Sequence, residues 1–116
     1  MLLLVTVVLL FASPAIAGQD GAQLLDDCNQ LIHAADGVKP EEPTKAGIQI
    51  VKCMSYVWGV MDTLNFQKIV CTEGVLPIDA IRIVVNYLKA HPERLDATAV
   101  ESVVRAFNPS VFRCLP

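Results

Sequence analysis

Apolar residues recur at every third or fourth position in several stretches of the chain, and this spacing predicts amphipathic helices. The first such stretch covers residues 24–35. Asp20 lies where an N-cap is needed, and Gly37 lies where a glycine would end the helix. The sequence therefore predicts a first helix of about four turns.

Two later stretches, residues 78–88 and 99–107, keep the same period and predict two further helices. The earlier of the two must end by His91, because proline at position 92 disfavours a helical backbone at the residue before it. Asp96 is the expected N-cap of the later one.

Residues 45–65 are apolar almost throughout, except for one narrow stripe at helical spacing. The stripe contains Gln49, Lys52, Ser55, Tyr56, Gly59, Asp62 and Thr63. A helix that is apolar on its other sides is expected to be surrounded by neighbours, so this segment is the predicted central helix. Ser55 and Gly59 lack bulk, which would let another backbone approach closely. Lys52 and Asp62 argue against its lying in a bilayer.

The two longer connections between the predicted helices differ in composition. Residues 36–44 are rich in proline and glutamate and read as a surface connection, while residues 66–77 have no helical period and read as a loop held by Cys71. The expected fold is all-α, a small disulfide-stapled bundle of four to five helices.

Residues 1–17 are interpreted as a secretory signal, and residues 18–116 as one helical domain. The apolar run of residues 2–12 is shorter than the roughly 20 residues of a spanning helix, and Ala15-Ile16-Ala17 offers a cleavage site after Ala17. The alternative is an uncleaved membrane anchor. The net charge of −3, with its signs interspersed, provides no basic patch for nucleic acid.

Four cysteines allow three pairings. The pairing of Cys28 with Cys53 would staple a helical hairpin, and the pairing of Cys71 with Cys114 would hold both a loop and the chain end, so this arrangement is preferred while the other two stay open. The closest cysteines are 18 positions apart, which is unlike the local pairs of a zinc site, so no metal is expected.

No catalytic set is evident, and the chain is expected to be no enzyme and to need no cofactor. A cysteine nucleophile at Cys28 with His33 as its base is the alternative, but a disulfide and a surface histidine explain these residues better. His91 is expected to act at a helix C-terminus. Asp62 is expected to accept hydrogen bonds from the loop of residues 66–71.

An ordered set of residues resembles the Rap/Tai immunity-protein family. It comprises Cys53-x-x-Tyr56-Val57-x-Gly59-Val60-x-Asp62, Cys71, Val84-Val85-Asn86-Tyr87-Leu88-x-x-His91-Pro92-Glu93, Ala99, Ala106 and Cys114. The resemblance implies a small all-helical periplasmic protein that binds and blocks a peptidoglycan-cleaving amidase effector delivered by type VI secretion. The chain departs from the family pattern at Leu76-Pro77, Asp79 and Phe112-Arg113-Cys114.

The expected function is therefore periplasmic immunity, by steric occlusion of a secreted cell-wall hydrolase. The candidate partner-binding residues are Glu41 and Glu42 in the first connection and Thr72 and Glu73 beside Cys71. The alternative is a periplasmic stress chaperone or a structural binding protein without an immunity role. The sequence leaves open whether the chain forms a homodimer.

Overall fold

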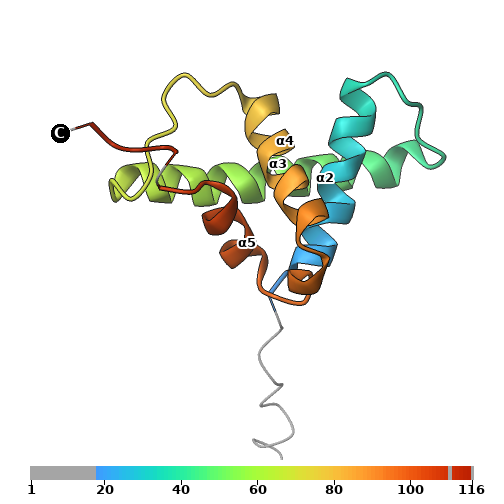
Figure 1. The fold of residues 1–116 in the computed structure, drawn as a ribbon. Helices are drawn as coiled ribbons and strands as arrows, with labels where there is room; N and C mark the ends of the chain where they lie inside the picture. The colour runs from blue at the N-terminus through green and yellow to red at the C-terminus, as the bar shows by residue number, and fades with distance from the viewer. Residues whose placement is uncertain (1–17, 110, 116) are drawn as a thin grey trace, which may run out of the picture.

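The computed structural model describes residues 18–109 and 111–115, so the predicted signal segment lies outside the described residues. The elements in chain order are α2 (Gly21–Ala35), α3 (Pro43–Phe66), α4 (Pro77–Ala90), the 3-10 turn η1 (Pro92–Arg94) and α5 (Ala99–Ala106). Helix α3 extends across the molecule, with α2, α4 and α5 packed along it (Figure 1). The predicted all-α fold is confirmed.

Helix α2 begins and ends where the sequence predicts. The Asp20 carboxylate accepts a hydrogen bond from the Gln23 amide at 2.8 Å, and the Gln23 side chain accepts one from the Asp20 amide at 3.0 Å, which is a complete capping box. Gly37 follows the helix with φ of 79°, a conformation that favours glycine.

The start of α2 is clamped to the segment before α5. The Gly21 amide donates to the Ala97 carbonyl and the Ala22 amide to the Leu95 carbonyl, both at 2.9 Å. A Cβ at Gly21 would lie 3.2 Å from the Leu88 side chain, so glycine favours this close approach and a larger residue would make its neighbours shift by a few tenths of an ångström. The contact closes the bundle at the end opposite the α2–α3 connection (Figure 1).

Helix α3 is not surrounded by its neighbours, so that prediction is wrong. One face is buried through Ala46, Cys53, Val57 and Leu64, whereas the opposite face is open to solvent. The 24-residue helix is about 36 Å long, and the shorter helices cross it on one side only. A Cβ at Gly59 would meet nothing within 4 Å, so no backbone approaches there.

Helix α4 ends before proline as predicted, with His91 as its C-cap. The His91 ring lies 2.8 Å through Nδ1 from the Tyr87 carbonyl and stacks on the Tyr87 ring at 4.3 Å. The N-cap of α5 is Thr98, whose hydroxyl accepts from the Glu101 amide at 3.3 Å. Asp96 is exposed in the turn after η1, two residues before this N-cap, so the prediction that it caps α5 is wrong.

Both predicted disulfides are present, which confirms the pairing. Cys28–Cys53 joins α2 to α3 inside the core, and Cys71–Cys114 joins the α3–α4 loop to the chain end. The core has contributions from every helix, and its largest fully buried side chain is Phe107 of the segment after α5. The Phe112 ring packs edge-on against the Phe107 ring, with 5.5 Å between the ring centroids, so the core extends into the C-terminal segment.

Candidate partner-binding surfaces

Residues 67–76 between α3 and α4 form a loop that we call the anchored loop. Its middle is tied to the C-terminal segment by the Cys71–Cys114 disulfide and by a hydrogen bond of 3.0 Å from the Cys71 amide to the Phe112 carbonyl. Lys68 at φ of 59° and Gly74 at φ of 82° shape its two turns. The loop therefore has a fixed course, although it contains no regular secondary structure.

Asn65 holds the anchored loop from the helix side. Its side-chain amide donates to the Thr72 hydroxyl at 2.8 Å and accepts from the Thr72 backbone amide at 2.9 Å. It also donates to the Met61 carbonyl at 3.0 Å. Asp62, which was expected to hold the loop, is instead exposed, and Asn65 makes the contact.

Thr72 is 7% exposed, so the expectation that it lies on the surface is wrong. Its hydroxyl and backbone amide both point to Asn65, which turns the side chain inward. Glu73 is exposed, as predicted. The loop also exposes Ile69 at 47% and Leu76 at 61%, two large apolar residues that the sequence analysis did not select. Such residues supply contact area that a partner can bury.

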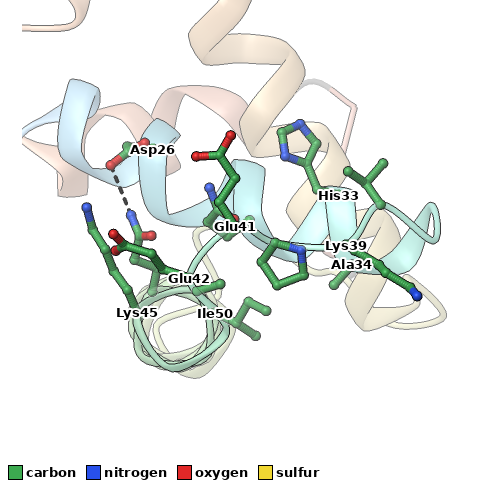
Figure 2. A pocket seen from close by; sticks show the side chains of 13 residues that line it. Asp26, His33, Ala34, Lys39, Glu41, Glu42, Lys45 and Ile50 are labelled. Atoms are coloured by element: carbon green, nitrogen blue, oxygen red, sulfur yellow. Dashed lines mark hydrogen bonds between the residues drawn. The ribbon is translucent and has the colours of Figure 1, made fainter.

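A hollow of about 480 Å³ lies between α2, the first connection and the start of α3. Figure 2 shows Asp26, Glu42 and Lys45 at one end, His33 and Lys39 at the other, and Glu41 between the two groups. Glu41 and Glu42 are exposed, as predicted. Carboxylates and ammonium groups are mixed in its lining. The hollow therefore suits a single protruding polar side chain of a partner better than a partner surface that carries one sign of charge.

Asp27 beside this hollow is buried and was not selected from the sequence. Its carboxylate accepts from the side chains of Gln19 at 2.8 Å and Gln49 at 3.3 Å, and Lys52 Nζ lies at 3.5 Å. These contacts join the segment before α2 to α3. Because a buried charge needs such partners, the cluster is explained by folding and needs no ligand.

Tyr56 on α3 is half-buried beside α5. Burial raises the pKa of its hydroxyl above the ordinary 10.0, and a hydrogen bond to the backbone of Val100 partly offsets this. The buried hydroxyl marks a contact between two helices.

The arrangement around the alternative nucleophile does not suit catalysis. Cys28 is fully buried in a disulfide and His33 is exposed, so no thiol is available to a base at this position. Within residues 18–109 and 111–115, no three side chains of histidine, cysteine, aspartate or glutamate are grouped to hold a metal ion. The helices in this part of the chain are all too short or too polar to span a membrane.

Comparison with known proteins matches the chain to one family. The family model for Rap1a immunity proteins matches residues 20–114, from the α2 cap to the last cysteine. No curated protein and no solved structure matches the chain. The match spans both disulfides and all the described helices, in agreement with the resemblance in the sequence. The chain belongs to the Rap1a immunity protein family.

Proposed function

We propose that the protein is a periplasmic immunity protein that binds and occludes a secreted peptidoglycan amidase effector, and that it catalyses no reaction. The family match is the observation that carries this proposal. Two disulfides suit an oxidising compartment such as the periplasm, where the cell wall and its hydrolases meet. The amidase substrate and the type VI delivery route come from the resemblance of the sequence to the family.

The anchored loop is the proposed inhibitory element. A hydrolase offers a cleft, so its inhibitor needs a protruding segment of fixed shape. The Cys71–Cys114 disulfide and the Asn65 clamp hold this loop before binding, which reduces the ordering entropy that binding would cost. Exposed Ile69 and Leu76 would provide apolar contacts, and Glu73 would add a charge that suits a basic rim.

Thr72 is buried, so its proposed role is no longer contact with the effector. Since its side chain is buried against Asn65, Thr72 would fix the shape of the anchored loop and would not touch the effector. Glu41 and Glu42 would form a second, weaker contact at the edge of the hollow. The convex loop is the better candidate of the two for entering a cleft.

The test uses the exported protein and amidase effectors from its own genome and from neighbouring strains, with binding measured by calorimetry and inhibition by release of peptidoglycan fragments. The double variant Ile69→Asp with Leu76→Asp should weaken binding by about a hundredfold, because two apolar contacts are lost. Thermal unfolding should hardly change, since both side chains are exposed. Glu41→Gln with Glu42→Gln tests the second contact in the first connection and should cause a much smaller loss of binding.

Failure to bind any amidase would refute the proposed target. The chaperone alternative predicts something different: loosening at low pH with binding of a hydrophobic dye, and acid sensitivity of a deletion strain. A compact protein at low pH, together with a deletion strain that is sensitive only to an attacking effector, would support immunity.

A further inference from the structure

The two disulfides differ in how far a reductant can reach them. We call Cys28–Cys53 the inner disulfide and Cys71–Cys114 the outer disulfide. Both cysteines of the inner disulfide are 0% exposed, whereas both of the outer one are partly exposed and the neighbouring Arg113 is open to solvent. A thiolate reduces a disulfide by attacking one of its sulfur atoms, so the rate depends on access. The outer disulfide can therefore be attacked in the folded protein, whereas attack on the inner one requires the core to open.

The outer disulfide holds the anchored loop against the C-terminal segment around Phe112. The same two segments share a hydrogen bond of 3.0 Å from the Cys71 amide to the Phe112 carbonyl. A backbone hydrogen bond contributes little net stability, because water competes for both groups once they separate. Without the outer disulfide, the loop and the C-terminal segment should therefore part for some of the time.

The core of the bundle should survive this loss. It includes both cysteines of the inner disulfide, whereas those of the outer disulfide lie outside it. Buried apolar side chains from α2, α3, α4 and α5 hold the helices together. Asn65 also continues to hold the loop at Thr72. Reduction of the outer disulfide should thus give a folded bundle with a loosened loop.

We propose that the outer disulfide is a redox switch that sets the shape of the anchored loop, with a protein dithiol as its reductant. One thiolate of the dithiol attacks a sulfur atom of the outer disulfide and forms a mixed disulfide, while the other cysteine leaves as a thiolate and takes up a proton. The second thiol of the dithiol then displaces this mixed disulfide. The protein gains two electrons and two protons, and the dithiol becomes a disulfide. Exchange with an oxidising disulfide reverses the reaction.

The link from this switch to immunity rests on the proposed function of the anchored loop. In the oxidised protein the loop is ordered before the effector arrives. In the reduced protein binding must also order the loop, which lowers the affinity. The protein would therefore inhibit strongly only in an oxidising compartment and weakly in a reducing one.

The first test follows reduction without any effector. The exported protein is incubated with dithiothreitol at neutral pH and without denaturant, free thiols are blocked with N-ethylmaleimide at successive times, and mass spectrometry locates them. Cys71 and Cys114 should be labelled at least about a hundredfold faster than Cys28 and Cys53, because opening the core costs much of the free energy of unfolding. Labelling of all four at one rate, or of the inner pair first, would overturn the proposal.

The partly reduced protein should stay folded. Its circular dichroism should keep the helical signal, and it should unfold cooperatively at a lower temperature because one cross-link is gone. The amide NMR signals of residues 71–76 and 111–115 should move toward those of a disordered chain, whereas the signal of Val84 inside α4 should stay in place. Oxidised glutathione should restore the original spectrum. Loss of the helical signal, or unchanged signals in the loop, would contradict the switch.

Cys71→Ser with Cys114→Ser fixes the open state without a reductant. This protein should bind a cognate amidase about tenfold more weakly than the oxidised wild type, since the loop is no longer ordered in advance. It should match the reduced wild type, and dithiothreitol should not change it further. Cys28→Ala with Cys53→Ala is the matched control. At a temperature where it is folded, it should bind like the wild type when oxidised and lose about tenfold on reduction, because it keeps the outer disulfide.

The switch and the proposed function fail in different ways. An amidase that binds the oxidised and the reduced protein equally would overturn the switch and leave the proposed function in place. Failure of every amidase to bind the oxidised protein would refute the proposed function. The order of reduction and the NMR signals would then still decide whether the outer disulfide controls the loop.

Discussion

Replacing Asn65 with alanine should release the anchored loop. The change removes both hydrogen bonds to Thr72, at 2.8 and 2.9 Å, and leaves the buried Thr72 amide without this partner. A net hydrogen bond stabilises by about 1 kcal/mol, and an unsatisfied buried donor costs about 1–3 kcal/mol. Alanine recovers about 0.5 kcal/mol through its higher helix propensity. The expected loss is about 2 kcal/mol.

The loss should appear first as local opening. The Cys71 amide, bonded to the Phe112 carbonyl at 3.0 Å, is a reporter that the substitution does not touch directly. If opening of the loop becomes easier by about 2 kcal/mol, hydrogen exchange of this amide should accelerate about thirtyfold, as measured by NMR. Thr72→Val removes only the hydroxyl and should cost about 1 kcal/mol, because the Asn65 amide keeps the Met61 carbonyl as acceptor.

Asp62→Asn is the matched control on the same helix, because the sequence favoured Asp62 for this contact. It should leave hydrogen exchange at the Cys71 amide unchanged. Unchanged exchange in the Asn65→Ala protein, or an equal acceleration in Asp62→Asn, would show that the proposed clamp does not hold the loop.

Three further outcomes follow from the structure. The Cys28→Ala, Cys53→Ala protein should lose about 3 kcal/mol of unfolding free energy in urea denaturation, because a disulfide closing a 25-residue separation no longer restrains the unfolded chain. Gly37→Ala should cost about 1 kcal/mol, since φ is 79° there, whereas Gly47→Ala on the exposed side of α3 should gain up to about 1 kcal/mol in the same assay. Burial raises the pKa of Tyr56 in the folded state, so folding favours the neutral hydroxyl. The contribution of Tyr56 to the free energy of unfolding is complete below pH 10 and is lost as the pH rises through the folded pKa. Ultraviolet titration of a protein with Tyr56 as its single tyrosine should place this pKa above 10.0.

The local features of the fold could be predicted because short-range chemistry decides them. The capping box at Asp20, the left-handed glycine at position 37 and the stop before proline 92 each depend on a few consecutive residues. The disulfide pairing also followed from the order of the helices, because a bundle brings Cys28 beside Cys53 and leaves Cys71 and Cys114 to each other.

The candidate site was harder to predict, since exposure depends on the whole bundle. Glu73, Glu41 and Glu42 are on the surface as expected, but Thr72 turns inward because Asn65, seven residues earlier, offers two hydrogen bonds to it. A polar residue in the last turn of a helix before an irregular loop is the signal that could have identified the Asn65 clamp.

The sequence by itself predicted the helices that the structure describes and the preferred disulfide pairing, because periodicity, capping and cysteine order act within single segments or between neighbouring ones. Only the tertiary structure decided which side of α3 is covered. The polar stripe of α3 does lie on its exposed side, but Ile48, Val51 and Phe66 beside the stripe are exposed as well, and periodicity could not separate them from the buried apolar residues. Three helices shorter than α3 cross it on one side, and their packing leaves the other apolar face in solvent.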